Sequence, residues 1–129
     1  MVIDTSALMA LLLDEPEAED FRTALELDET RLLSAATLLE TAVVIEARKG
    51  EAAGRELDRL IDKAVVTIVA VDADQVEEAR RAWRRFGRGR HQAGLTYGDL
   101  FAYALSRTTG EPLLFKGDDF RRTDVARVI

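Results

Sequence analysis

The sequence predicts an α/β fold: a three-layer α/β/α sandwich with a mostly parallel central sheet flanked by helices. Short apolar segments alternate with longer helical segments along the 129 residues, and the short segments are apolar throughout. Strands of that kind are buried on both faces, as in parallel sheets covered by helices. No internal repeat, linker or low-complexity segment interrupts the pattern. We therefore expect one domain over residues 1–129.

The first half of the chain is expected to hold two short strands and four helices. Pro16 suits the first turn of the second helix. Ser34 suits the N-cap of the third helix, and Gly50 suits its end. The expected strands are residues 2–4 and 32–33, and the expected helices are residues 5–13, 15–27, 35–49 and 51–63.

In the second half, the β-branched run Val65–Val71 predicts a strand. Asp72 suits the N-cap of a helix that runs to Phe86. The glycine-punctuated stretch GRGRHQAG predicts a loop. The remaining expected elements are a helix at residues 98–108, a strand at 113–115 and a candidate last strand in the tail, 125–129.

Composition narrows the class of protein. An apolar fraction of 47% and a charged fraction of 33% describe a globular chain rather than a disordered one. The absence of cysteine excludes disulfides, thiolate metal sites and a cysteine nucleophile. No targeting segment and no apolar run of membrane-spanning length is visible, so we expect a cytoplasmic protein without membrane contact.

The net charge of −6, from 18 basic and 24 acidic residues, argues by itself against a nucleic-acid-binding protein. The charge is unevenly spread, however. Acids crowd residues 14–21 and arginines crowd residues 80–91. The net charge therefore does not decide the question.

Glu40 is the only charged residue in the segment Ala35–Ile45. Helical spacing places it in an apolar stripe with Ala36 and Val43. A glutamate in that position is costly unless it is paired or binds a cation. The alternative is that Glu40 reaches a nearby arginine or lies at a wet edge of the helix.

Four aspartates stand next to apolar segments. Asp4 ends the first strand and Asp99 lies in the first turn of an apolar helix, and each has an alternative explanation as a helix-capping acid. Asp118 and Asp119 follow the strand PLLF and Gly117. Adjacent residues face different ways, so at most one of these two points into a shared site. The alternative for this pair is a solvated turn.

Taken together, these acids each stand beside an apolar segment, and two of them follow strands of the predicted sheet, at whose carboxyl ends the ligands of α/β proteins bind. Carboxylates gathered without basic partners repel one another, and a divalent cation relieves that repulsion. Oxygen ligands favour Mg²⁺ or Mn²⁺ over zinc. Mg²⁺ shares its coordination sphere with water and phosphate, which indicates hydrolysis of a phosphodiester or phosphate ester.

Histidine chemistry does not fit. His91 is the only histidine, which excludes a metal-free ribonuclease with a histidine pair. His91 also lies in a loop rich in glycine and arginine, beside no obvious serine nucleophile, so we discount Ser-His-Asp acyl transfer.

The stretch RRAWRRFGRGRH, Arg80–His91, contains six arginines. Trp83 and Phe86 share a helix face that we expect to be buried, with the arginines on the outer side. One interpretation is a basic track for an RNA backbone. The alternative is a solvated helix face paired with Glu77 and Glu78. The candidate RNA contacts are Arg81, Arg84, Arg85, Arg88, Arg90 and, outside this stretch, Lys116.

Four segments resemble the PIN-domain ribonucleases, specifically the VapC toxins of type II VapBC toxin–antitoxin modules. They are VIDTSAL (2–8), LLETAVVIEAR (38–48), LTYGDLFAYALS (95–106) and PLLFKGDDFRRTD (112–124), and they occur in order over nearly the whole chain. The resemblance implies a PIN-like sandwich and an Mg²⁺-dependent endoribonuclease, with Mn²⁺ able to substitute, acting on transfer or ribosomal RNA. The products would carry 5′-phosphate and 3′-hydroxyl ends.

The resemblance also implies partners. A cognate VapB antitoxin would wrap the toxin and block its site with a C-terminal segment. The toxin would form a homodimer, or a larger toxin–antitoxin assembly, and would meet DNA only through the antitoxin.

Carried onto this sequence, the resemblance implies that Asp4 and Asp99 are the principal metal ligands. Glu40 would assist the metal or its water. Asp118 would be the fourth catalytic and metal-binding acid, with Asp119 as the alternative or as the residue that holds the turn together.

By the same resemblance, Thr5 and Ser6 would support the first aspartate. Two rival functions stay open. A small-molecule phosphatase would carry a second aspartate two residues after its nucleophile, where this chain has Ser6. A catalytically silent PIN-like module would bind RNA or protein and use its acids only for structure or for a basic partner.

Overall fold

A four-stranded parallel sheet lies at the centre of the molecule. The computed structural model describes all 129 residues. The strand order is β3-β2-β1-β4, and Val2 lies opposite Leu32 on one side and Leu113 on the other. The strands are β1 (Val2–Ile3), β2 (Leu32–Ser34), β3 (Thr67–Val69) and β4 (Leu113–Leu114). Because every neighbouring pair is parallel, the strands' carboxyl ends lie along one edge of the sheet.

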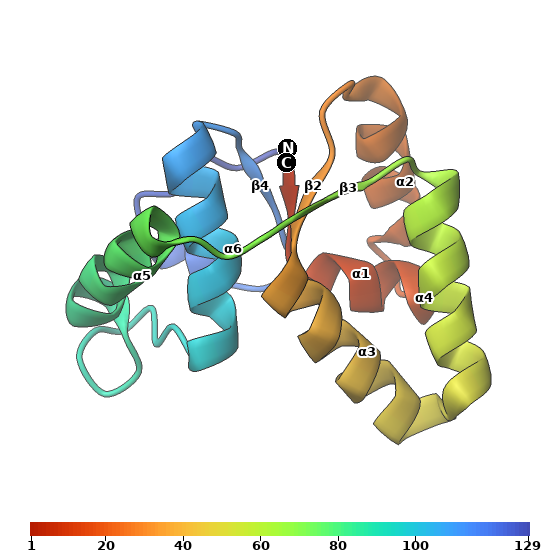
Figure 1. The fold of residues 1–129 in the computed structure, drawn as a ribbon, viewed down its shortest axis with the longest axis horizontal. Helices are drawn as coiled ribbons and strands as arrows, with labels where there is room; N and C mark the ends of the chain where they lie inside the picture. The colour runs from red at the N-terminus through yellow and green to blue at the C-terminus, as the bar shows by residue number, and fades with distance from the viewer.

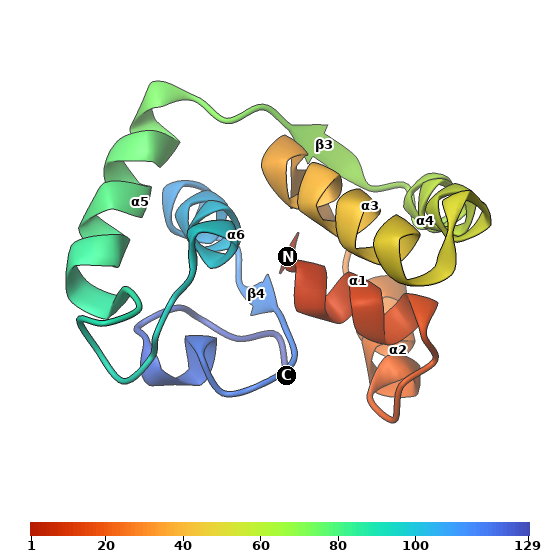
Figure 2. The same ribbon diagram turned by 90° about the horizontal axis from the view of Figure 1, so that it is seen from below.

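Helices cover both faces of this sheet, which confirms the predicted α/β/α sandwich (Figures 1 and 2). One face carries α1 (Thr5–Leu12), α2 (Ala18–Leu27), α3 (Ala35–Lys49) and α4 (Glu51–Lys63). The other face carries α5 (Ala73–Phe86), α6 (Tyr97–Thr109) and the 3₁₀ helix η1 (Phe120–Arg122). No helix is both long enough and apolar enough to cross a bilayer.

Each face of the sheet has its own apolar core. Leu8, Leu33 and Ile45 belong to the core under α1–α4. Leu95 and Tyr103 belong to the core under α5 and α6. The central strand β1 and the strand β4 are therefore buried and wholly apolar, whereas β3, at the other edge of the sheet, is largely exposed.

The predicted caps hold the helix boundaries. Ser34 Oγ accepts a hydrogen bond from the Ala36 N–H at 3.3 Å, and Asp72 Oδ1 accepts one from the Gln75 N–H at 2.9 Å. Gly50 ends α3 with a φ of +84°, a conformation that favours glycine. The predicted helices at 35–49 and 51–63 and the helix that ends at Phe86 are confirmed.

Three expected elements differ from the structure by more than one residue at an end. The strand expected over Val65–Val71 is reduced to β3, an edge strand with β2 as its only neighbour. The helix expected from residue 15 begins at Ala18, after a turn that contains Pro16. The tail forms only an isolated bridge between Arg127 and Leu113 rather than a strand.

Candidate active site

Asp4 follows β1 at the carboxyl edge of the sheet and caps α1. Its Oδ2 accepts hydrogen bonds from the Ser6 N–H at 3.0 Å and from Ser6 Oγ at 2.6 Å. The residue is only 4% exposed. Burial raises the pKa of Asp4 to about 7 against the lowering effect of the Ser6 hydrogen bonds, and the charges of Asp99 and Glu40 add to the rise. The capping role expected as an alternative is therefore real, and Asp4 also faces two other acids.

Ser6 links Asp4 to the strand at the edge of the sheet. Its Oγ accepts a hydrogen bond from the Lys116 N–H at 2.9 Å, just after β4. The same hydroxyl donates to Asp4. The resemblance implies that Thr5 and Ser6 support the first aspartate. The contacts of Ser6 are of that kind, whereas the Thr5 hydroxyl donates to Glu40 instead.

Glu40 projects from α3 toward the start of α1. Its Oε1 accepts a hydrogen bond from Thr5 Oγ1 at 2.5 Å, so its hydrogen-bond partner is a hydroxyl rather than an arginine. Thr5 Oγ1 in turn lies 3.1 Å from the hydroxyl oxygen of Thr41, a fully buried residue. Sequence analysis does not single out Thr41, whose only signal is its place directly after Glu40.

Asp99 lies in the first turn of α6. Its Oδ2 accepts a hydrogen bond from the Thr96 N–H at 2.9 Å, which confirms a helix-capping role. Burial raises the pKa of Asp99 against the hydrogen bonds from Thr96, and the charges of Asp119 and Glu40 raise it further. Asp99 therefore lies within electrostatic reach of three other acids.

Both aspartates of the turn after β4 are exposed, but they differ in their neighbours. The Asp118 side chain is 76% exposed, and its Oδ1 lies 4.0 Å from Arg121 Nε. Asp119, by contrast, is one of the charges that raise the pKa of Asp99. The sequence predicts Asp118 as the fourth acid, whereas the effect of its charge on Asp99 favours Asp119.

These acids form an electrostatic cluster without a basic partner among them. No three aspartate, glutamate or histidine side chains are close enough to form a ready-made metal cage. Mg²⁺ usually keeps several waters and takes only one or two carboxylates from the protein. Both hydrogen bonds to Asp4 end on Oδ2, which leaves Oδ1 available to a cation. The donor set would therefore suit an Mg²⁺ held by Asp4 and Asp99.

Only some arginines of the basic stretch Arg80–His91 are free of ion pairs with acidic side chains. The alternative interpretation, a helix face paired with Glu77 and Glu78, holds for Arg80 and Arg81. Exposed ion pairs of this kind contribute little to stability. The ion pairs are Arg80–Glu77 at 3.2 Å, Arg81–Glu78 at 2.8 Å and Arg85–Asp124 at 3.2 Å.

The other candidate RNA contacts differ in their freedom. Arg84 and Arg88 form no ion pair, and the Arg90 guanidinium stacks over the Trp83 ring at 4.2 Å. Lys116 Nζ pairs with the carboxylates of Glu15 and Glu17, and these contacts raise its pKa. Arg84, Arg88 and Arg90 are therefore the freer cations.

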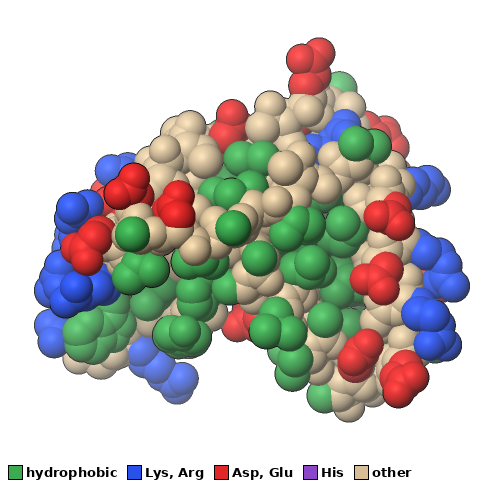
Figure 3. Space-filling model, in the orientation of Figure 1, with side chains coloured by type: hydrophobic (Ala, Val, Ile, Leu, Met, Phe, Trp, Pro, Cys, Tyr) green, Lys and Arg blue, Asp and Glu red, His purple; other side chains and the backbone are tan.

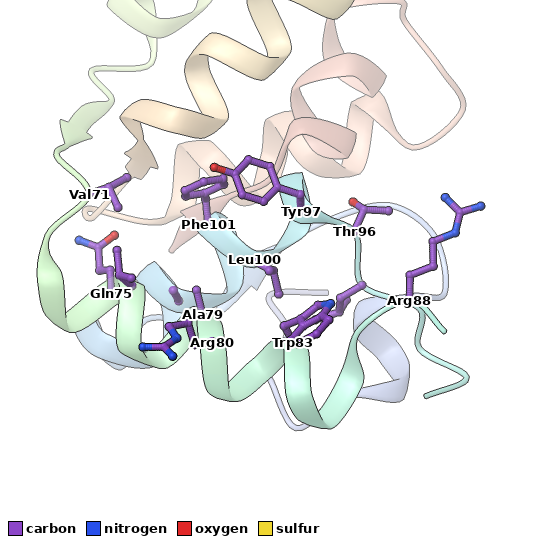
Figure 4. A pocket seen from close by; sticks show the side chains of 13 residues that line it. Val71, Gln75, Ala79, Arg80, Trp83, Arg88, Thr96, Tyr97, Leu100 and Phe101 are labelled. Carbon is purple, nitrogen blue, oxygen red and sulfur yellow. The ribbon is translucent and has the colours of Figure 1, made fainter. Parts of the chain in front are cut away.

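An apolar groove lies beside the acids, between α5 and α6. It has a volume of about 580 Å³, and Trp83 projects into it from α5 while Tyr97 and Phe101 project from α6 (Figure 4). The expectation that Trp83 is buried with Phe86 is wrong: Trp83 is 43% exposed, because its side chain lines this open groove. Tyr97, two residues before Asp99, is 79% exposed.

Comparison with known proteins gives consistent matches over the whole chain. Residues 1–126 match the PIN domain family. Ribonuclease VapC30 of Mycobacterium tuberculosis (strain H37Rv) is 60% identical over 128 residues, which cover 99% of this chain and 98% of that protein. Ribonuclease VapC of Mycolicibacterium smegmatis is also 60% identical, with 99% of each chain covered.

A solved structure has the same fold at low identity. The crystal structure of Mycobacterium tuberculosis VapC20, described as a sarcin-ricin loop cleaving toxin, superposes with a TM-score of 0.78 at 20% identity. The match covers 97% of this chain and 95% of that one. At this identity the likeness supports the fold alone.

Proposed function

This chain belongs to the PIN-domain family and, within it, to the VapC ribonucleases, and from that premise we propose that it is an Mg²⁺-dependent endoribonuclease. Mn²⁺ would substitute for Mg²⁺. The observation that carries the proposal is the group of acids around Asp4: burial and neighbouring carboxylates raise the pKa of Asp4 and of Asp99, and the group has no basic partner. Such a group suits a divalent cation and a phosphodiester substrate.

The chain's own residues divide the work. Asp4 and Asp99 would hold the cation through their carboxylate oxygens, and Ser6 fixes the orientation of Asp4. Glu40, whose carboxylate is fixed by the Thr5 hydroxyl, orients the attacking water and accepts its proton. Asp119 adds negative charge next to Asp99. Bound Mg²⁺ would lower the pKa of the attacking water and offset charge on the phosphate.

An RNA substrate must approach a protein with a net charge of −6. We propose that Arg84, Arg88 and Arg90 provide the local attraction, because they are not engaged with acidic side chains. Arg81, Arg85 and Lys116 would contribute only after exchanging an acidic partner for a phosphate.

Partners follow from the same proposal. A VapB antitoxin would bind this chain and block the acidic site. We also propose a homodimer, since hydrophobic side chains gather over α3 and over α5 and α6 on one face (Figure 3). On α3, Leu39 and Val43 are exposed, and α3 packs next to α6. The exposed Leu39 and Val43 form a ridge on α3, and the apolar groove lies between α5 and α6. A ridge and a groove on neighbouring helices can form a self-complementary two-fold interface.

Cleavage of RNA by the purified, antitoxin-free chain tests the function. Total cellular RNA is incubated with Mg²⁺ or Mn²⁺, with excess EDTA as the parallel reaction, and with Asp99→Asn beside the wild type. We expect discrete fragments that require both the metal and Asp99. Absence of cleavage by a folded, metal-supplied chain across many RNAs would instead favour the silent binding module.

A further inference from the structure

Gly98 is the second residue of α6, between Tyr97 and Asp99. Glycine within a helix lowers its stability relative to alanine. The φ of Gly98 is not positive, so the backbone at this position accepts any L-residue without strain. Neither helix propensity nor backbone conformation explains a glycine here.

The surroundings of Gly98 do explain it. A Cβ added to Gly98 would lie 2.6 Å from Glu40 Cδ and 3.0 Å from Oε1, and closer still to Oε2. The Glu40 carboxylate therefore occupies the space that any side chain at position 98 would need. This contact brings a carboxylate of α3 against the first turn of α6.

The opposite side of the same carboxylate is also held. Thr5 Oγ1 donates to Glu40 Oε1 at 2.5 Å. Glu40 is thus confined between the start of α1 and the start of α6, whose first turn also carries Asp99.

We propose that Gly98 is a positioning residue: by having no side chain, it sets where the Glu40 carboxylate lies relative to Asp4 and Asp99. This inference rests on the proposed function, in which Glu40 handles the attacking water. It adds a residue that touches neither substrate nor metal but fixes Glu40, the residue that handles the attacking water.

Gly98→Ala tests the proposal. The clashing atoms are the far end of a flexible side chain, so the glutamate moves while the backbone stays in place. Residues that orient metal ligands typically alter affinity or activity by roughly 10- to 100-fold when changed. We expect a loss of kcat in that range with KM for RNA unchanged, and weaker Mn²⁺ binding by calorimetry.

Gly54→Ala is the matched control. Gly54 lies within α4, and a Cβ there would lie 2.8 Å from Cδ of Glu46, a second glutamate of α3. Glu46 is exposed and belongs to no acidic site. Gly54→Ala therefore displaces a glutamate in the same way, and we expect wild-type kcat and Mn²⁺ affinity.

A double-mutant cycle of Gly98→Ala with Glu40→Ala supplies a readout that needs neither metal nor RNA. Alanine favours a helix more than glycine does, so Gly98→Ala should raise the free energy of unfolding. With Glu40 present this gain is reduced, because the carboxylate must move. With Glu40→Ala, the full gain appears. In kcat, Gly98→Ala should add little to the loss already caused by Glu40→Ala.

These experiments distinguish the positioning role of Gly98 from the proposed ribonuclease function. Wild-type cleavage together with wild-type kcat and Mn²⁺ affinity in Gly98→Ala would overturn the positioning role and leave the proposed function intact. A wild-type chain that neither binds Mn²⁺ nor cleaves RNA would overturn the function and the positioning role together. In that case, coupling between Gly98 and Glu40 would appear only in the free energy of unfolding. Additive effects in unfolding would show that the contact does not constrain Glu40.

Discussion

The Lys116 N–H donates a hydrogen bond to Ser6 Oγ at 2.9 Å, and the same hydroxyl donates to Asp4 at 2.6 Å. One small side chain thus ties the end of β4 to the acid that follows β1. These two strands are direct neighbours in the sheet. The position of Asp4 therefore depends on the edge strand as well as on its own helix cap.

We predict that Ser6→Ala destabilises the fold. The Lys116 N–H loses its partner and Asp4 loses one of its two donors. The expected loss is about 1–3 kcal/mol in the free energy of unfolding, measured by urea denaturation. Ser6→Thr, which keeps the hydroxyl, is the control. An alanine variant as stable as the wild type would show that these bonds contribute nothing.

The fourth acid can be identified by two neutral substitutions. Asp119→Asn removes a charge that acts on Asp99 and should lower RNA cleavage about tenfold. Asp118→Asn changes an exposed side chain and should leave cleavage near the wild-type rate. Single-turnover rates at saturating Mg²⁺ compare the two, and the reverse order of effects would restore Asp118 as the fourth acid.

Stability without metal should depend on the pH through Asp4. The pKa of this group rises from 3.8 to about 7 on folding, so the folded state holds an extra proton between those values. The stabilisation of the folded state by this proton is complete below pH 3.8 and is lost as the pH rises through 7. In EDTA, the melting temperature of the wild type should therefore fall relative to that of Asp4→Asn between about pH 4 and 7. Parallel curves would contradict the raised pKa.

The proposed dimer face gives a prediction about assembly. Leu39→Asp and Val76→Asp place a charge on exposed apolar positions of α3 and α5 and should convert a dimer to a monomer, since a charge buried in an interface is costly. Leu27→Asp, at an exposed leucine at the end of α2, is the matched control. Light scattering after size exclusion reports the mass. A monomeric wild type at micromolar concentration, or dimeric variants, would contradict this interface.

Local chemistry accounts for what the sequence predicted well. Ser34, Gly50 and Asp72 define helix ends through contacts within three or four residues of themselves, so their effect is readable without the fold. Asp4 and Asp99 were recognisable because each stands next to an apolar segment at a strand or helix end. These signals do not depend on long-range contacts.

Long-range packing accounts for the rest. The β-branched run Val65–Val71 has the composition of a strand, yet only β2 is present to pair with it. Which of Asp118 and Asp119 faces Asp99 depends on how η1 leaves the turn after Gly117. The role of Gly98 is invisible in sequence because Glu40 lies 58 positions earlier in the chain.

Anomalous diffraction from a crystal of this chain soaked in Mn²⁺ tests the central claim most directly. The account predicts a manganese peak bound by carboxylate oxygens of Asp4 and Asp99, with Glu40 separated from it by one water, and no such peak in crystals of Asp99→Asn. A wild-type crystal with no peak among these acids at millimolar Mn²⁺, or with the acids paired to basic side chains instead, would contradict it.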